Sequence, residues 1–334
     1  MDAIPLYPLR FEPLYQYRLW GSRRLGRLLS ATLPGSEPIG EAWLLSDRDD
    51  HPSRVAEGPL RGKTIAELAA QSPDQLLGRL AGRFSRFPLL LKLLDVKQRL
   101  SVQVHPSDAY QGLIPNGETG KTEAWVVLEN GPGARVFAGL KTGITEDRMR
   151  RAIAEGTVAE ELAEFTPIPG DAVLIHAGTV HSLADVVVFE VQQNSDVTFR
   201  LFDWDHIDPK TLERRPLQVE PALACIDFER GAVTPLTPRM IERRPVLRER
   251  LFHCEQFAAT RISGREPFIV GRADTPRVLV CLSGRGHLEY AGQTYSFGRG
   301  QVLLTPAVVG ECLCRPHGTV CILEISLPDR PSIS

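Results

Sequence analysis

The sequence predicts a mainly β protein built from two jelly-roll barrels with a small helical insert. Short apolar segments recur along most of the chain and are separated by Gly- and Pro-containing turns, which is typical of antiparallel barrels and sandwiches. Helical patterns are confined to the ranges 63–86 and 145–165. In addition, the segment PGDAVLIHAG at 169–178 resembles RGQVLLTPA at 299–307, which indicates an internal duplication.

The N-terminal region alternates predicted strands with the helical insert. Thr64 is followed three residues later by Glu67, the pattern of a capping box, so a helix is expected to begin there. Ser72 followed by Pro73 predicts the start of a second helix, because proline suits the first helical turn. Strands are predicted from the apolar segments 20–21, 39–44 and 89–105.

The central and C-terminal regions continue this pattern. Thr145 caps a predicted helix, and a further helix is expected around 158–165. A looser stretch rich in Pro and Arg covers about 206–248. Strands are predicted at 124–128, 172–175, 186–192, 198–202, 277–282, 286–290, 293–297, 301–305 and 322–327. We therefore expect a metal-binding domain over 1–245 and a C-terminal barrel without metal over 246–334.

Composition excludes several classes of protein. The 334 residues are 43% hydrophobic and 24% charged, with a formal net charge of −2, which gives no footprint for nucleic acid. No apolar run is long enough for a membrane span, and the first residues lack the pattern of a signal peptide, so we expect a cytoplasmic protein. The six cysteines lie between Cys225 and Cys321 without a CxxC pair and are interpreted as free thiols. We expect a monomer or a weak homo-oligomer.

Four side chains able to bind a metal lie in or beside strand-like segments. Gln103 and His105 are two residues apart, so they point to the same side of a strand. Glu123 follows Gly-Lys-Thr, and His181 follows Gly-Thr-Val. If these segments are neighbouring strands of one barrel, an amide oxygen, two imidazoles and a carboxylate converge, a set that suits zinc or another divalent first-row ion.

Three segments resemble the type I mannose-6-phosphate (phosphomannose) isomerases of the cupin superfamily. They are PLLLKLLD and LSVQVHP at 88–106, GKTEAW at 120–125, and AGTVHS with FEVQQNSDVTFRLFD at 177–203. The N-terminal segment IGEAWLLS at 39–46 also fits. The resemblance covers most of the chain and implies a cupin-type fold. It also implies an enzyme that interconverts D-mannose 6-phosphate and D-fructose 6-phosphate through an enediol intermediate.

The resemblance also implies roles for individual residues. It implies one zinc ion per chain, with the ligands Gln103, His105, Glu123 and His181. It assigns catalytic positions to Arg200, Lys121 and Glu190, and substrate-binding positions to Ser101, Lys121 and Arg200. Burial of Lys121 beside zinc would lower its pKa. The general base is left open between Glu190, His176 and a water on the metal.

Two positions depart from the family pattern. His176 stands where many relatives have proline, and His206 stands where larger relatives have lysine. Structural interpretations also stay open for two of the implied site residues. Glu190 is a candidate buried, paired carboxylate, and Arg200 a candidate ion-pair partner of Asp203 or Asp205.

Two other classes of function compete with the isomerase. A metal-binding cupin oxygenase would also hold an ion in a barrel, commonly with iron or manganese and a His-rich ligand set. A non-catalytic sugar-phosphate-binding protein would keep the pocket without turnover. The amide ligand argues against the oxygenase, and the presence of Lys121, Glu123 and Arg200 argues against the binding protein.

Overall fold

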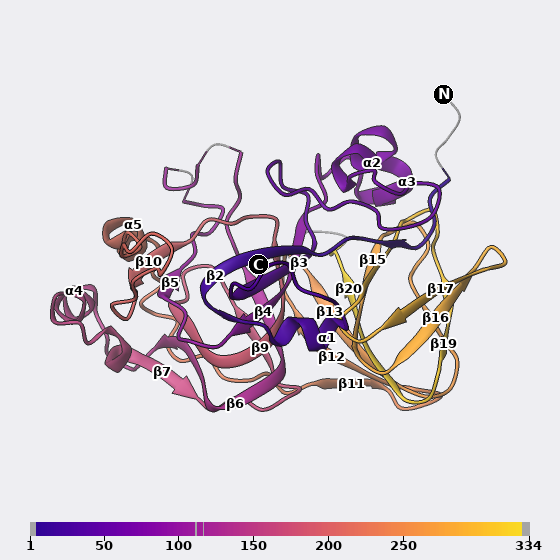
Figure 1. The fold of residues 1–334 in the computed structure, drawn as a ribbon. Helices are drawn as coiled ribbons and strands as arrows, with labels where there is room; N and C mark the ends of the chain where they lie inside the picture. Colours follow the sequence, from indigo (N-terminus) through magenta and orange to yellow (C-terminus); the bar gives the residue numbers. More distant parts are fainter. Residues whose placement is uncertain (1–4, 111, 116, 329–334) are drawn as a thin grey trace.

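The computed structural model describes residues 5–110, 112–115 and 117–328. Strands dominate these residues, and the helices are short and lie at the periphery (Figure 1). The prediction of a mainly β protein is therefore confirmed, whereas the division into two jelly-roll barrels stays a prediction. In the described ranges, no helix is long and apolar enough to cross a membrane.

The larger sheet of the N-terminal region holds the predicted site residues. Its strands follow the order β10 (Phe199–Phe202), β5 (Val102–Val104), β9 (His181–Gln193), β4 (Leu89–Val96), β3 (Ile39–Leu45) and β2 (Leu14–Ser22). The long strand β6 (Glu123–Leu140) pairs with β9 and also with β7 (Leu162–Phe165) and β8 (Ala172–Ile175). Both β4 and β9 are almost wholly buried, which explains their continuous apolar sequences.

Two further sheets contain mainly C-terminal strands, drawn in orange and yellow in Figure 1. One follows the order β1 (Leu9–Arg10), β18 (Val302–Thr305), β15 (Arg277–Ser283), β20 (Val320–Ser326), β13 (Ala258–Gly264), β12 (Leu247–His253) and β11 (Arg239–Glu242). The other follows the order β14 (Phe268–Val270), β19 (Cys312–Pro316), β16 (Arg285–Tyr290) and β17 (Gln293–Gly298). The N-terminal strand β1 pairs with β18, so the two ends of the chain share one sheet.

The capped helices begin where the sequence predicts. Thr64 and Glu67 form the capping box of α2 (Ile65–Gln71), and α3 (Pro73–Leu77) begins at the predicted proline and continues into a 3-10 turn, η1 (Gly78–Leu80). The Thr145 side chain accepts a hydrogen bond from the Arg148 backbone at the start of α4 (Glu146–Glu155).

Three other segments differ from expectation. The helix expected around 158–165 is wrong: a 3-10 turn, η2 (Val158–Glu161), is followed by β7. The apolar residues of this strand pair with β6, which decides between helix and strand where a short apolar segment alone cannot. The helices α1 (Arg24–Leu29) and α5 (Val219–Cys225) were not predicted, and neither has a side-chain cap at its N-terminus.

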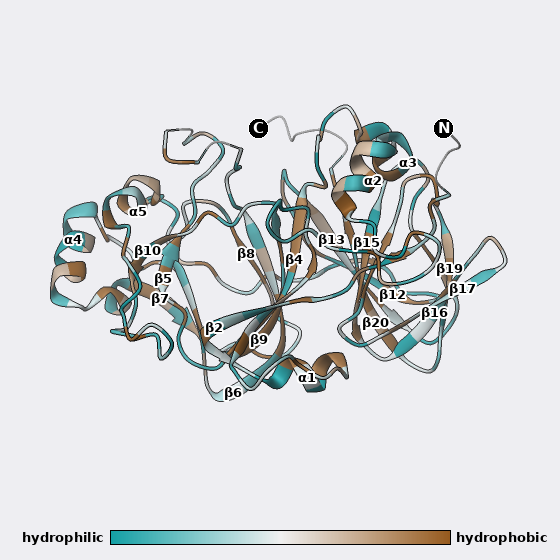
Figure 2. Cartoon of the chain, turned by 45° about the horizontal axis from the view of Figure 1, so that its top comes forward, coloured by the Kyte–Doolittle hydropathy of each residue, from teal (hydrophilic) through white to brown (hydrophobic). Residues whose placement is uncertain are grey.

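One hydrophobic core links the N-terminal and C-terminal sheets. Leu9 and Leu25 belong to the same buried cluster as Phe189, Leu304 and Ile325. Figure 2 shows hydrophobic residues in brown along the central strands such as β4 and β9, while the outer helices contain both hydrophilic and hydrophobic residues. This shared core fixes the position of the larger sheet and therefore of the site that it carries.

Candidate functional site

Strand register places three predicted site residues side by side. Arg200 on β10 pairs with Gln103 on β5, and Gln103 pairs with His181 on β9. Directly paired residues of neighbouring strands point to the same face of a sheet. The three side chains therefore form one row, although almost a hundred residues separate the first from the last in the sequence.

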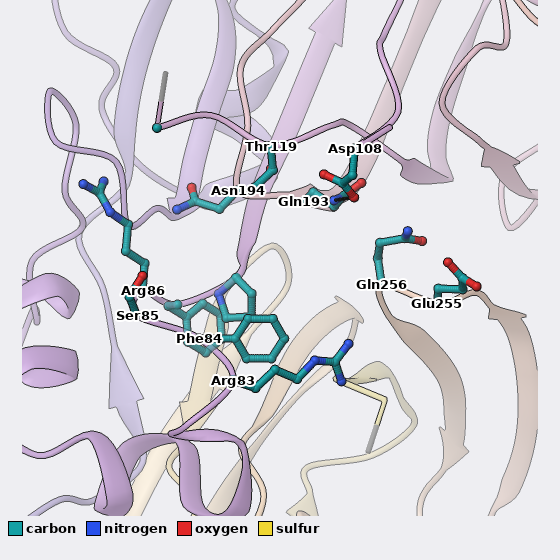
Figure 3. Close-up of a pocket in the computed structure, with 13 residues that line it drawn as sticks. Arg83, Phe84, Ser85, Arg86, Asp108, Thr119, Gln193, Asn194, Glu255 and Gln256 are labelled. Atoms are coloured by element: carbon teal, nitrogen blue, oxygen red, sulfur yellow. Dashed lines mark hydrogen bonds between the residues drawn. The ribbon is translucent and has the colours of Figure 1, made fainter. Parts of the chain in front are cut away.

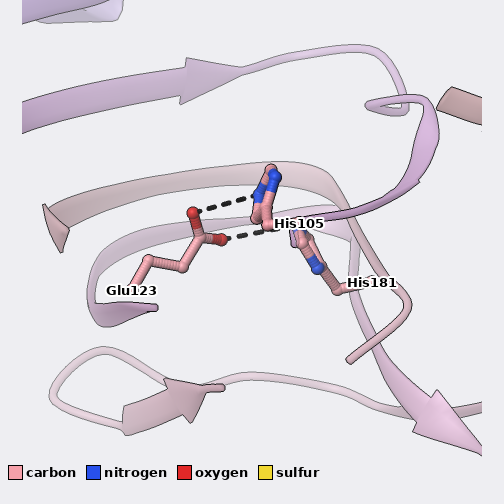
Figure 4. A group of neighbouring side chains, drawn as sticks. All are labelled: His105, Glu123 and His181. Atoms are coloured by element: carbon pink, nitrogen blue, oxygen red, sulfur yellow. Dashed lines mark ion pairs between the residues drawn. The ribbon is translucent and has the colours of Figure 1, made fainter. Parts of the chain in front are cut away.

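Two further predicted ligands complete a buried cluster with His181 (Figure 4). The Nε2 atom of His105 lies 3.3 Å from Oε2 of Glu123, and Nε2 of His181 lies 3.3 Å from Oε1 of the same carboxylate. All three side chains are at most 1% exposed. The amide nitrogen of Gln103 lies 3.2 Å from Nε2 of His181. The structure thus brings together all four candidate ligands.

The protonation of the two imidazoles turns their lone pairs toward this cluster. His105 Nδ1 lies 2.9 Å from the Val197 carbonyl oxygen, and His181 Nδ1 lies 2.9 Å from the Thr179 carbonyl oxygen. Since a carbonyl oxygen only accepts, each Nδ1 donates the hydrogen bond and each Nε2 carries the lone pair. Burial, followed by the Lys121 charge, lowers the pKa of His105 to about 3, and burial lowers the pKa of His181.

The donor set fits a metal ion. Two imidazole lone pairs face a carboxylate that also only accepts, and His105 Nε2 and both Glu123 oxygens have no hydrogen-bond partner among the described residues, although Lys121 forms an ion pair with Glu123 Oε2. Acceptors in such an arrangement repel one another unless a cation lies between them. Ligand atoms of a tetrahedral zinc ion, about 2.0–2.2 Å from the metal, lie roughly 3.3–3.6 Å from one another. The two observed separations of 3.3 Å, each to a different Glu123 oxygen, fall in this range, and the three ligand atoms all lie within 4.8 Å of one another.

Gln103 can supply an oxygen to the same centre. In the structure its Oε1 accepts a hydrogen bond from Ser101 at 3.2 Å, and its amide nitrogen faces His181. The two ends of an amide are nearly equal in shape, and a half-turn of the group exchanges them. After this half-turn the oxygen faces the centre, and Ser101 contacts the amide nitrogen.

Local turns hold the ligands in place. Gly178 has a φ of 84° and begins the turn that leads into His181. Its backbone nitrogen donates a hydrogen bond to the His105 carbonyl at 2.8 Å, which ties the two ligand segments together. A Cβ atom at this position would lie 3.1 Å from Asp227, so glycine also satisfies the space available.

A cavity of about 400 Å³ adjoins the metal-ligand cluster. All the implied catalytic and substrate-binding residues line it, together with Gln103. Its charged lining consists of five cations and three carboxylates: Arg18, Lys92, Lys121, Arg200, Arg215, Glu41, Glu190 and Asp196. This excess of positive charge suits an anionic ligand.

Glu190 has the environment of a proton-transfer group. It is 3% exposed, and its Oε2 accepts a hydrogen bond from the Trp125 indole at 2.8 Å. Its Oε1 lies 3.8 Å from Nζ of Lys92. Burial, followed by the negative charge of Glu123, raises the pKa of Glu190 to about 7. Glu190 is therefore both a buried, paired carboxylate and a cavity residue.

The expectation that the pKa of Lys121 falls beside zinc stays a prediction, and the protein groups around Lys121 act on its pKa in both directions. Burial does act to lower the pKa, but the charges of Glu123, Glu190 and Asp196 outweigh burial and raise it. Its Nζ lies 3.1 Å from Glu123 Oε2. The neighbouring carboxylates thus favour the protonated form of Lys121 beside the candidate ligands.

The sequence interpretation missed several charged cavity residues, including Lys92 and Asp196. Lys92 interrupts the apolar strand β4, is 3% exposed and lies 3.2 Å from Asp196. A lysine inside a fully buried strand requires a partner, so this interruption was a usable signal. Glu41 gives the same signal in the buried strand β3, whereas Arg18 lies in the partly exposed strand β2 and gives none.

In the described part of the chain, Arg200 forms no direct ion pair, and Asp203 acts on it only as a nearby charge. No carboxylate forms an ion pair with Arg200 among the described residues, and its buried Nε has no hydrogen-bond partner there. The expected partners bind other residues: Asp203 pairs with Arg215, and Asp205 pairs with Arg214.

His176 and His206, the two residues that depart from the family pattern, are not among the residues that line this cavity. The charges that act on the pKa of His176 are those of Arg230 and Glu255, after a larger lowering by burial. The Nδ1 of His206 lies 3.7 Å from Asp203. His176 is therefore badly placed to act as the base.

A larger cavity of about 480 Å³ lies elsewhere, between the segments 83–88, 193–194 and 255–256 (Figure 3). Its charged side chains are Arg83, Arg86, Asp108 and Glu255. None of the residues in the metal-ligand cluster lines it. The implied catalytic and substrate-binding residues thus line the smaller cavity and not the larger one.

Comparison with known proteins identifies relatives of the whole chain. Residues 9–119 match the catalytic domain of type I phosphomannose isomerase. The chain is 32% identical over 308 residues to the probable mannose-6-phosphate isomerase GmuF of Bacillus subtilis, covering 91% of this chain and 95% of that protein. It is 31% identical over 306 residues to the mannose-6-phosphate isomerase of Streptococcus mutans, covering 90% and 93%.

A solved structure shows the same fold. The crystal structure of the mannose 6-phosphate isomerase from Bacillus subtilis superposes with a TM-score of 0.87 at 28% sequence identity. The match covers 96% of this chain and 99% of that one. The likeness therefore includes the C-terminal sheets as well as the sheet that carries the candidate site.

Proposed function

The chain belongs to the type I phosphomannose isomerase family, and we propose that it interconverts D-mannose 6-phosphate and D-fructose 6-phosphate. The observation that carries this proposal is the placement of the candidate metal ligands beside a cationic cavity. Glu190, Lys121, Arg200 and the candidate ligand Gln103 all line one open cavity of about 400 Å³. A space of this size can hold a six-carbon sugar phosphate.

We propose that one zinc ion binds per chain through Gln103, His105, Glu123 and His181. With one carboxylate and three neutral ligands, the centre keeps a formal charge of about +1. When bound, the metal acts as a Lewis acid that favours negative charge on substrate oxygens.

Isomerisation requires that a proton leaves C2 of the aldose and returns to C1 through an enediol. Glu190 is the group that we assign to this transfer. Its raised pKa, about 7, allows it both to accept and to return a proton near neutral pH. The Trp125 indole holds one carboxylate oxygen at 2.8 Å, so the other oxygen is left to act in the cavity.

Lys121 and Arg200 stabilise the negative charge that develops as the proton leaves. We assign Lys121 the role of a cation, because the charges of Glu190 and Asp196 act to raise its pKa together with that of Glu123. Arg200 offers a planar set of donors from the neighbouring strand. Lys92 lies 3.8 Å from Glu190 and 3.2 Å from Asp196, so its charge is shared between the two carboxylates.

A coupled isomerase assay with metal analysis tests the proposal. The purified protein should convert mannose 6-phosphate to fructose 6-phosphate and carry about one zinc per chain. Chelation should abolish turnover and leave the circular dichroism spectrum largely intact, and zinc should restore turnover. A metal-loaded protein that binds the sugar phosphate without converting it would favour a binding protein, and oxygen consumption with an organic substrate would favour an oxygenase.

A further inference from the structure

The larger cavity lies where the N-terminal and C-terminal regions of the chain meet. Residues 83–88, which lead into β4, form one part of its wall, and Gln193 at the end of β9 forms another. Glu255 and Gln256 belong to the turn between β12 and β13 and complete the wall from the C-terminal side. A cavity of about 480 Å³ at such a junction has the size and place typical of a small-molecule site.

The charged side chains of this cavity balance one another. The lining contains two cations, Arg83 and Arg86, and two carboxylates, Asp108 and Glu255. Arg86 also forms an ion pair with Asp49 at 2.9 Å. The larger cavity therefore lacks the excess of positive charge found in the proposed catalytic cavity, and it offers an anionic ligand no net attraction.

Amides and hydroxyls form much of the remaining polar lining. They belong to Ser85, Thr119, Gln193, Asn194 and Gln256. Amide and hydroxyl groups both donate and accept hydrogen bonds without carrying a charge. The hydroxyl groups of a sugar have the same property, so they match this lining. Phe84 and Pro88 add apolar surface that C–H groups of a sugar ring can contact.

Hydrogen bonds fix the part of the wall next to β9. Asp108 Oδ1 accepts a hydrogen bond from the Gly120 backbone at 2.7 Å, and Asp108 Oδ2 accepts one from Gln193 Nε2 at 3.1 Å. Gln193 Oε1 in turn accepts a hydrogen bond from the Thr122 backbone at 2.9 Å. Each carboxylate oxygen can accept a second hydrogen bond. Asp108 is thus held in place and remains an acceptor for a ligand.

Other polar side chains of the lining have no protein partner. Ser85, Glu255 and Gln256 form no side-chain hydrogen bond or ion pair with any residue that the structure describes. In Figure 3, Ser85 and Gln256 lie on opposite sides of the open space. Their donors and acceptors are therefore available to a molecule that enters between them.

We infer that this cavity binds a neutral sugar, a hexose or hexose glycoside without a phosphate group. Asp108 and Glu255 accept hydrogen bonds from the sugar hydroxyls, and the Gln256 amide both donates and accepts. The balanced charge of the lining favours an uncharged sugar over a sugar phosphate. The inference goes beyond the proposed isomerase activity and does not depend on it, because it concerns a separate cavity.

Calorimetric titration of the zinc-loaded protein with methyl α-D-mannopyranoside and methyl α-D-glucopyranoside tests the inference. Both glycosides are uncharged, and their locked rings cannot be isomerised. We expect saturable binding of at least one of them to the wild type. For Gln256→Ala we expect Kd to rise about threefold to tenfold, because hydrogen bonds between uncharged groups are lost. Gln293→Ala is the matched control and should bind as the wild type does, since Gln293 is exposed on β17 outside this lining.

Two further variants separate this cavity from the catalytic one. Gln256→Trp places a large side chain at the cavity wall and should abolish glycoside binding while leaving turnover of mannose 6-phosphate unchanged. Arg200→Ala alters the catalytic cavity and should bind the glycoside as the wild type does. Loss of binding in Arg200→Ala but not in Gln256→Trp would overturn the inference by assigning the sugar to the catalytic cavity. Absence of saturable binding to the wild type, or equal binding by the wild type and both Gln256 variants, would also overturn it.

Discussion

At the scale of single residues, the clearest feature is a cluster of buried hydrogen-bond acceptors that face one another: two imidazole nitrogens and a carboxylate. The Nε2 atoms of His105 and His181 both lie 3.3 Å from the Glu123 carboxylate. Their Nδ1 atoms are fixed by backbone carbonyls, which orients the rings and sets the tautomer. The backbone hydrogen bonds therefore preorganise both imidazoles, with Nε2 free to bind a cation.

We expect His181→Ala to lower the metal content well below one ion per chain. The substitution removes one of the ligands and leaves a cavity that water can enter. Plasma mass spectrometry after dialysis measures the effect, and circular dichroism checks the fold. His287→Ala is the control, because His287 lies on β16 outside the cluster and should leave the metal content unchanged. Full zinc and full activity in His181→Ala would refute the ligand assignment.

Arg200→Ala should keep the metal but lose activity. Arg200 is the cavity cation without an ion-pair partner among the described residues, so its donors are available to the substrate. We expect a loss of about 2–4 kcal/mol of transition-state stabilisation, obtained from the ratio of kcat/KM values. Near-normal turnover of mannose 6-phosphate would contradict this role.

Glu190 gives a prediction about pH in the metal-free protein. Because its pKa is raised to about 7 from an ordinary 4.5, folding takes up a proton between these values, so stability falls as pH rises from about 4.5 to 7 and stays at the lower level above pH 7. We expect Glu190→Gln to gain stability relative to the wild type as pH rises from 5 to 8, by an amount on the order of 1–3 kcal/mol. Urea unfolding of both chelated proteins at the two pH values measures the difference. A constant difference would show that Glu190 does not titrate in this range.

At the scale of elements, side-chain caps fix the helical segments that cover the core. The Thr64 hydroxyl accepts a hydrogen bond from the Glu67 backbone at 3.0 Å, and a Glu67 carboxylate oxygen accepts one from the Thr64 backbone at 2.7 Å. The helix that follows buries Ile65 and Leu68. The cap thus places an apolar helix face on the shared core.

Thr64→Ala should destabilise the protein by about 1 kcal/mol, because the orphaned backbone donor at the helix start loses its acceptor. Denaturant unfolding measures this loss, and Thr64→Ser, which keeps the hydroxyl, is the control. The isomerase rate of the folded protein should not change, since α2 lies outside the cavity. A stability equal to that of the wild type would show that the capping box does not stabilise this helix.

At the scale of the whole molecule, the N-terminal and C-terminal sheets depend on each other. Strand β1 pairs with β18, with Leu9 opposite Leu304. Leu251, Leu323 and Ile325 share one buried cluster with residues of the larger sheet. We propose that residues 246–334 form a structural unit that covers the catalytic region.

Truncation before Leu251 should therefore produce an insoluble or weakly stable protein, because it exposes a large apolar surface. Co-expression of the missing segment as a separate chain is the control and should restore part of the soluble yield. Light scattering and thermal unfolding measure both outcomes. A soluble, fully active fragment ending near residue 245 would show that the C-terminal region is dispensable, and stoichiometric metal on the isolated C-terminal fragment would show that it holds a site of its own.

The sequence by itself determined the features that depend on local pattern. Alternating apolar segments with Gly turns specified a mainly β chain, and the caps at Thr64 and Thr145 marked the beginning of two helices. The uncapped helices α1 and α5 escaped prediction because their short sequences carry no such signal. The ligand candidates could be named because Gln103 and His105 share one strand segment and the other two stand in distinctive motifs.

Only the tertiary structure decided which distant side chains share the cavity. Register between β5, β9 and β10 aligns Gln103, His181 and Arg200, and a loop brings Arg215 to the same space. Strand pairing also turned 162–165 into β7, against the helical expectation. The physical reason is that pairing, burial and the balance of buried charge depend on neighbours far along the chain, whereas caps and turns depend on residues only a few positions away.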